Sequence, residues 1–169
     1  MSEHGSQIHH HEGELKLPAA SREFVQKELK RYETRESALI PCLYEAQKVF
    51  GWISPEVIDV LAKEMDIPPS RVNEVAQFYT MFNKKPVGKY HIQVCTNISC
   101  CMVGARETMD QICQKLGVKP GEVSKDGKYT VEGVECLGSC GSGPMAQIND
   151  DYFENLSPEN LDQVLKGLK

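Results

Sequence analysis

CTNISC at residues 95–100 and CLGSC at residues 136–140 contain four of the seven cysteines in this 169-residue chain. Four residues separate the cysteines of the first segment and three separate those of the second, and about 35 residues lie between the segments. Thiolates that meet from two separate loops are typical ligands of an iron-sulfur cluster or of a closed metal site. Cys95, Cys100, Cys136 and Cys140 are therefore candidate ligands of such a site.

The spacing of these cysteines helps to choose between metals. Structural zinc sites usually draw on CxxC pairs, which turn two thiolates onto one ion. The wider intervals here suit a 2Fe-2S cluster, in which each iron takes two thiolates, although neither segment follows the cysteine runs of ordinary ferredoxins. The spacing favours a 2Fe-2S cluster and leaves open a zinc-stabilised binding module, thiol redox chemistry and simple burial.

The composition predicts a soluble protein of one or two domains. The chain is 40% hydrophobic, but it has no apolar run of membrane-spanning length and no signal peptide at its start, so we expect a cytoplasmic protein with no membrane insertion of its own. An odd number of cysteines without a secretion signal indicates reduced thiols. A net charge of -5 offers no footprint for nucleic acid, so the expected partner is another protein.

The chain divides near residues 84–88, which separate helical patterns from alternating strand and helix patterns. We predict a disordered tail over residues 1–17, a helical bundle over 18–85 and a second domain over 86–169. The tail is polar and aperiodic and carries a group of histidines without a predicted role. These are His4, His9, His10 and His11.

Four helices are predicted in the bundle. Ser21 is a plausible N-cap of the first, Gly51 ends the second, Ser54 caps the third ahead of Pro55, and the fourth follows Pro69. Apolar residues recur at helical spacing on one face of each. The face of the fourth comprises Val72, Val75, Phe78, Tyr79 and Phe82, and its aromatic end, with Met81, fits either internal packing, which we favour, or a partner interface.

The second domain reads as strand, helix, strand, strand, helix. A strand over residues 90–95 delivers Cys95 at its end, and a second strand runs from Tyr129 toward Cys136. A short third strand covers 145–148, and Ser157 with Pro158 opens the last helix. This order predicts an α/β layer with a sheet of four or fewer strands and both cysteine loops at strand ends.

Three segments carry a family resemblance. CTNISCCMVG (95–104), VECLGSCGSGPMAQIND (134–150) and EVAQFYTMF (74–82) resemble the thioredoxin-like 2Fe-2S subunit of NADH:quinone oxidoreductase, the small E subunit of bacterial complex I. The resemblance extends from about residue 20 to the end of the chain. It implies an α+β protein in which an N-terminal helical bundle precedes a thioredoxin-like α/β ferredoxin domain.

The resemblance also implies a function. Cys95, Cys100, Cys136 and Cys140 would bind one 2Fe-2S cluster and pass single electrons beside a flavin subunit that holds FMN and oxidises NADH. The protein would be an NADH dehydrogenase subunit peripheral to the inner membrane, with no complete active site of its own. Related subunits occur in NAD-linked hydrogenases and formate dehydrogenases, so the parent enzyme stays open. The sequence contains no dinucleotide loop, phosphate loop or nucleophile motif.

Three further cysteines need a separate interpretation. Cys101 adjoins Cys100, and consecutive residues point in different directions, so only one of them can face the cluster. The four-residue interval of the resembling family selects Cys100. Cys42 and Cys113 lie on apolar helix faces and are predicted to be core residues, because free cysteine is often buried.

The glycines around the second segment have two expected roles. Gly138, Gly141 and Gly143 suit a tight turn, and they also leave backbone N–H groups free to approach the cluster sulfurs. The helix after Cys100 is expected to present its positive end nearby. Pro144 fits a rigid turn in either a cis or a trans form, and Met145 is expected in the core.

Overall fold

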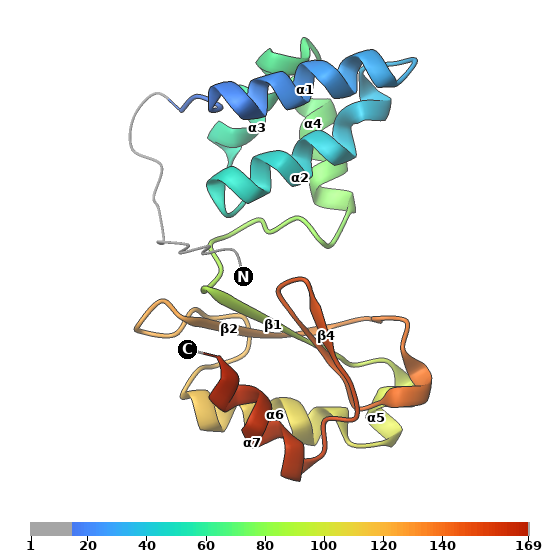
Figure 1. Ribbon diagram of the computed structural model, residues 1–169, viewed down its shortest axis with the longest axis vertical. Coiled ribbons are helices and arrows are strands. Elements are labelled where there is room, and N and C mark those ends of the chain that lie inside the picture. Colours follow the sequence, from blue (N-terminus) through green and yellow to red (C-terminus); the bar gives the residue numbers. More distant parts are fainter. Residues whose placement is uncertain (1–14, 169) are drawn as a thin grey trace. The chain divides into compact units, whose positions relative to one another are not determined.

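The computed structural model describes residues 15–168, which form two compact units that divide between Pro86 and Val87. The first unit is helical and the second combines a sheet with helices (Figure 1). The predicted boundary between residues 85 and 86 lies one residue from this division. Residues 1–14 of the predicted tail lie outside the described residues, but Leu17 is 2% exposed and belongs to the helical core, so the tail prediction was wrong at this position.

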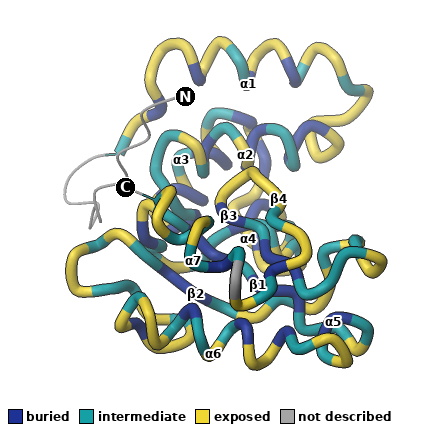
Figure 2. The backbone as a smooth tube through the Cα atoms, turned by 60° about the horizontal axis from the view of Figure 1, so that its bottom comes forward, coloured by how far each residue is buried: buried dark blue, intermediate teal, exposed yellow. Residues whose placement is uncertain are grey.

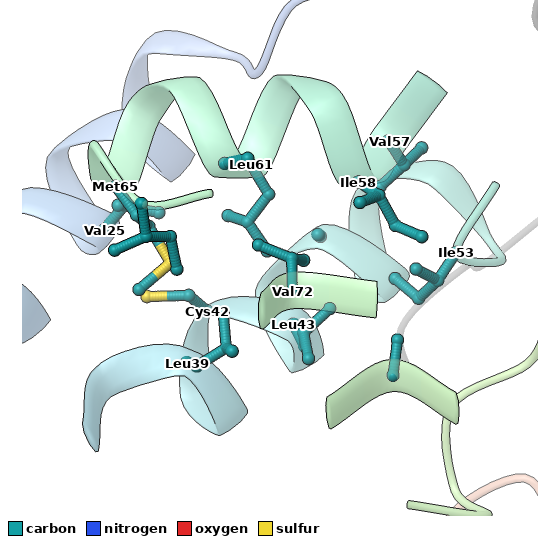
Figure 3. Packing of buried hydrophobic residues seen from close by; sticks show 14 of the residues in the cluster. Val25, Leu39, Cys42, Leu43, Ile53, Val57, Ile58, Leu61, Met65 and Val72 are labelled. Atoms are coloured by element: carbon teal, nitrogen blue, oxygen red, sulfur yellow. The ribbon is translucent and has the colours of Figure 1, made fainter. Parts of the chain in front are cut away.

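The helical unit contains four α-helices: α1 (Ala19–Arg31), α2 (Leu39–Phe50), α3 (Pro55–Met65) and α4 (Pro69–Phe78). A 3-10 turn, η1 (Glu36–Ala38), leads into α2. Figure 3 shows how side chains from all four helices meet in one core. The labelled residues are Val25, Leu39, Cys42, Leu43, Ile53, Val57, Ile58, Leu61, Met65 and Val72.

The predicted helix ends are correct for α2 and α3 and wrong for α1. Gly51 ends α2 with a φ of 82°, and Ser54 Oγ accepts a hydrogen bond of 3.2 Å from the Val57 N–H at the start of α3. The N-cap of α1 is Pro18, whereas Ser21 lies inside the helix and is buried. Ser21 Oγ donates to Glu45 Oε1 at 2.7 Å, so its hydroxyl joins α1 to α2 instead of capping.

The predicted apolar face of α4 is wrong at Phe78, whose side chain is 78% exposed. Six residues at 3.6 per turn place Phe78 about 240° around the helix from the buried Val72. The helix ends at Phe78, and the turn that follows returns Phe82 to the core, where its ring lies 5.2 Å from that of Tyr44. Tyr79 and Met81 also pack against the core.

The second unit is built on a four-stranded sheet with strand order β2-β1-β3-β4. The strands are β1 (Tyr90–Cys95), β2 (Tyr129–Val134), β3 (Ala146–Ile148) and β4 (Asp151–Phe153). β1 pairs with β2 in parallel and with β3 in antiparallel orientation, and β4 pairs antiparallel with β3. The thioredoxin-like α/β layer is therefore present, and β4, too short to show a pattern, is the strand that the sequence missed.

Helices α6 (Ala105–Leu116) and α7 (Pro158–Gly167) cover the same face of this sheet (Figure 1). Ile92 of β1 pairs in register with Val131 and Ile148, and all three point into the core beneath the helices. The two strands with neighbours on both sides, β1 and β3, are more buried than the edge strands β2 and β4 (Figure 2). No helix within residues 15–168 is long and apolar enough to span a membrane.

Replacing Leu61 with alanine tests the helical core. Leu61 is fully buried, so we expect the free energy of unfolding of the helical unit to fall by about 2–5 kcal/mol. Phe78→Ala is the control, with an expected change within about 0.5 kcal/mol because the ring is exposed. Urea denaturation followed by fluorescence of Trp52, the one tryptophan of the chain, measures both. Equal losses in the two variants would contradict this assignment of core and surface.

Candidate metal centre

Both cysteine segments leave the same edge of the sheet. Cys95 is the last residue of β1 and is the register partner of Val134, the last residue of β2. Because the two strands are parallel, their carboxyl ends lie together, and the loops that follow start side by side. Cys100 lies in the short helix α5 (Ile98–Met102), and Cys140 begins the 3-10 turn η2 (Cys140–Ser142). Figure 1 shows α5 and this turn at one end of the sheet.

The two cysteine pairs differ in burial. Cys95 and Cys100 are 2% and 1% exposed and belong to the core of the second unit, whereas Cys136 and Cys140 are exposed. The site therefore has a buried side built on β1 and α5, and a surface side built on the loop after β2.

The thiols of the two pairs interact with one another. Burial raises the pKa of Cys100 to about 11, helped by the contact with the Cys95 thiol and by the charges of Cys140 and Cys136. Burial also acts to raise the pKa of Cys95, but the backbone N–H groups of Asn97 and Leu137, with the thiols of Cys100 and Cys136, outweigh it and lower the pKa overall. The structure thus brings together the four cysteines named from the sequence.

The four thiols do not surround the position of a single metal ion. Within the described residues, no three or more His, Cys, Asp or Glu side chains are arranged around one metal-ion position. The thiol of Cys95 makes hydrogen-bond contacts with the thiols of Cys100 and Cys136.

The three glycines of the second loop have different surroundings, and only Gly138 and Gly143 have a specific role. The Gly138 N–H donates to Cys136 Sγ at 3.3 Å, and its φ of 77° favours glycine, so it is both turn and donor. At Gly143 a Cβ atom would lie 3.2 Å from Cys100 Sγ and 3.0 Å from Val103 Cγ2, so this position must stay small. A Cβ atom at Gly141 would meet nothing within 4 Å.

The remaining cysteines have other surroundings. The Cys101 thiol donates to the Thr96 carbonyl at 3.2 Å. Cys42 is fully buried in the helical core, where burial, with Glu28 and Glu45, raises its pKa to about 12. Cys113 packs against the core of the second unit, and burial, with Asp110, raises its pKa. Cys42 and Cys113 are thus packing residues, as predicted.

Helix α5 and the residues around Pro144 are parts of the site's surroundings. Cys100 lies inside α5, and α6, the longer helix that follows it, begins at Ala105. The Gly143-Pro144 bond is cis, which the sequence left open. The next residue, Met145, is fully buried as predicted, and its carbonyl accepts a hydrogen bond of 3.1 Å from the Cys95 N–H.

The segment formed by β4 and the residues that follow it is a part of the site that the sequence patterns did not predict. Tyr152 Oη donates to the Leu137 carbonyl at 3.0 Å, and Glu154 accepts from Ser142 Oγ at 2.5 Å. These contacts join residues 12 and 15 apart in the chain. A pattern of neighbouring residues in the sequence does not predict contacts between residues so far apart in the chain.

The family model for thioredoxin-like 2Fe-2S ferredoxins matches residues 25–169. The chain belongs to this family. The resemblance noted in the sequence is thereby confirmed, and so is the thioredoxin-like fold class.

Curated relatives agree with the family match. The chain is 44% identical to the E subunit of NADH-quinone oxidoreductase from Rickettsia bellii, over 83% of this chain and 86% of the relative. It is 40% identical to NADH-quinone oxidoreductase subunit 2 of Thermus thermophilus, over 88% of this chain and 83% of the relative. At this identity and coverage the chain is a member of the family of NADH-quinone oxidoreductase E subunits.

A solved structure supports the fold alone. An NAD+-reducing NiFe hydrogenase in the H2-reduced state superposes with a TM-score of 0.67 at 21% identity. The match covers 77% of this chain but only 22% of the hydrogenase chain. The same arrangement of elements therefore occurs as a part of a much longer chain.

Substitution of the loop glycines tests the packing at the site. Gly143→Ala would press its Cβ against Cys100 Sγ, and we expect the purified protein to hold at most half of the wild-type iron and sulfide. Gly141→Ala is the matched control, because its Cβ has open space and its φ is not in the left-handed region. Iron and sulfide analysis with visible absorbance measures the outcome. Equal metal content in the two variants would contradict the close approach of Gly143 to Cys100.

Proposed function

We propose that this chain is the electron-transfer subunit of an NADH:quinone oxidoreductase and holds one 2Fe-2S cluster. The observation that carries the proposal is the meeting of four thiols from two loops at one edge of the sheet, in a member of the E-subunit family. The protein is accordingly a subunit of an oxidoreductase.

The proposed ligands are Cys95, Cys100, Cys136 and Cys140. A 2Fe-2S cluster needs four thiolates divided between two irons, so it does not require three or four side chains to surround a single ion. Cys101 is not a ligand in this proposal, because its thiol is occupied with the Thr96 carbonyl. The donor set is therefore all sulfur, which suits iron-sulfur chemistry.

The chain's own groups prepare the ligands for binding. A cysteine ligates as the thiolate, and the lowered pKa of Cys95 favours that form at the buried side of the site. The Gly138 N–H bond to Cys136 Sγ stabilises negative charge at the surface side. When bound, a 2Fe-2S cluster takes up one electron and releases it again, and four protein ligands leave no position for a substrate.

The proposed partner is the subunit that binds FMN and NADH. The chain has no dinucleotide motif, so hydride transfer from NADH must take place elsewhere in the complex. The proposed location is peripheral to the inner membrane, on its cytoplasmic side, through that complex. Nucleic acid has no part in this proposal.

The second candidate is the same role in an NAD-linked hydrogenase or formate dehydrogenase, and the fold of the hydrogenase chain is consistent with it. A zinc-stabilised module is the remaining alternative.

Cysteine-to-serine variants test the ligand set. Replacing any one of Cys95, Cys100, Cys136 or Cys140 with serine should abolish the visible spectrum and the EPR signal of the reduced protein, because it removes one of the four thiolates that a 2Fe-2S cluster requires. Cys101→Ser is the matched control, since a serine hydroxyl can still donate to the Thr96 carbonyl. It should retain two irons per chain. A colourless wild-type protein with one zinc would reject the cluster, and loss of the cluster in Cys101→Ser would reject the ligand assignment.

Anaerobic purification from the native source tests the parent enzyme. Mass spectrometry of the bound proteins should find an NADH-oxidising flavin subunit together with membrane subunits of a quinone reductase. NADH should reduce the cluster in that preparation, because the flavin subunit supplies the electrons. Recovery of hydrogenase or formate dehydrogenase subunits in their place would move the chain to the second candidate function while keeping the cluster.

A further inference from the structure

The segment formed by β4 and the residues that follow it holds the second cysteine loop at several points. Tyr152 Oη donates to the Leu137 carbonyl at 3.0 Å. The Asn155 N–H donates to the Ser142 carbonyl at 2.7 Å, and the Leu156 N–H donates to the Pro144 carbonyl at 2.8 Å. The acceptors of these three bonds lie on both sides of Cys140, with Leu137 before it and Ser142 and Pro144 after it. The loop that carries Cys136 and Cys140 is thus fastened along most of its length.

Glu154 adds a side-chain contact at the middle of this loop. Its Oε1 accepts a hydrogen bond of 2.5 Å from Ser142 Oγ and a short one from Ser139 Oγ. The two serine hydroxyl oxygens lie 2.6 Å apart. The hydroxyls of Ser139 and then Ser142 lower the pKa of Glu154, so its carboxylate is ionised at neutral pH. Ser139 directly precedes Cys140, and Ser142 follows it by two residues.

The number of protons shared by Glu154, Ser139 and Ser142 determines whether the serine hydroxyls can donate to the sulfurs of the cluster. Each serine hydroxyl carries one proton, and an ionised carboxylate carries none. Both protons have acceptors within the group: the Glu154 carboxylate, the hydroxyl of the other serine and, for Ser142, the Ser139 carbonyl at 3.2 Å. Neither hydroxyl then has a proton to donate to a sulfur of Cys140 or of the cluster.

Hydrogen bonds to the sulfurs make an iron-sulfur cluster easier to reduce, because reduction adds a negative charge that donors stabilise. A residue that withholds two nearby donors therefore keeps the reduction potential low. Exposed charges act weakly because solvent screens them, and the Glu154 carboxylate is exposed. Its effect on the cluster must then pass mainly through the two serines and through the position of the loop.

We propose that Glu154 is a positioning residue for the 2Fe-2S cluster: it fastens the loop of Cys136 and Cys140 through Ser139 and Ser142, and it keeps both serine hydroxyls from donating to the cluster sulfurs. This inference rests on the proposed function, because it needs a cluster at the four cysteines. It assigns a role in tuning the cluster to a side chain that binds no iron.

Four variants of the full-length chain separate the parts of this proposal. Glu154→Ala removes both the carboxylate and the acceptor oxygen, and Glu154→Gln removes the charge but keeps an acceptor. The triple variant Ser139→Ala/Ser142→Ala/Glu154→Ala removes the hydroxyls as well. Asp151→Ala is the matched control for charge, because Asp151 is an exposed carboxylate three residues earlier on β4.

Each purified protein is first analysed for iron and sulfide. The reduction potential is then measured by an EPR-monitored titration, and loss of iron to a chelator is followed by visible absorbance. In Glu154→Ala the equilibrium constant for reduction should rise about tenfold, which is ~59 mV for one electron. The equilibrium constant for reduction should stay within about twofold of wild type, or ~18 mV, in Glu154→Gln, Asp151→Ala and the triple variant.

Iron release should be about tenfold faster in Glu154→Ala and in the triple variant. It should be close to wild type in Glu154→Gln, because glutamine can still accept from the serines.

Several results would overturn the inference. An unchanged potential in Glu154→Ala, an equal rise in the triple variant, or an equal rise in Glu154→Gln would reject the withholding of the hydroxyls. Unchanged iron release in Glu154→Ala would reject the fastening of the loop. If Glu154→Ala fails to fold, the double variant Ser139→Ala/Ser142→Ala decides: faster iron release without a rise in potential supports the inference, and wild-type release rejects it. A wild-type protein without iron and sulfide would instead reject the proposed function.

Discussion

Parallel pairing of β1 with β2 is the constraint on which the rest of the second unit depends. It places Cys95 opposite Val134, so both cysteine loops start at the same edge of the sheet. Parallel neighbours need a crossover connection, which α6 provides while covering the sheet. The register is held by the buried pair Ile92 and Val131, because a shift by one residue would turn each strand's apolar side chains away from the helices. The core that stabilises the fold thereby also sets the geometry of the thiols.

The site joins a rigid buried side to a surface loop. Cys95 and Cys100 belong to the core, so their positions are set by the packing that stabilises the domain. Cys136 and Cys140 are exposed and lie in a loop that has little core of its own. Such a loop needs support from elsewhere in the chain, and the segment around Glu154 supplies hydrogen bonds to it. This division explains why a short edge strand, β4, matters for the site.

Local patterns were sufficient for most elements and failed where the chain left its regular path. The alternation in β1 and the stop at Gly51 were read correctly, because each depends on neighbours within a few residues. Ser21 has the chemistry of an N-cap, but Pro18 is the N-cap of α1 and the Ser21 hydroxyl bonds to Glu45 of α2. Phe78 looked apolar and periodic, yet α4 ends there and the ring stays exposed. In each failure a contact or a helix end absent from the local pattern decided the outcome.

The sequence by itself determined the fold class, the change from helical to mixed patterns and the four candidate ligands, because cysteine spacing and hydrophobic period are local properties of the chain. Tertiary structure alone decided that Cys101 bonds to the Thr96 carbonyl, that Gly143 must stay small beside Cys100, and that Glu154 contacts the serines flanking Cys140. The last of these contacts links residues 12 and 15 positions apart. It exists only because β3 and β4 fold back along β1 and return the chain to the second cysteine loop.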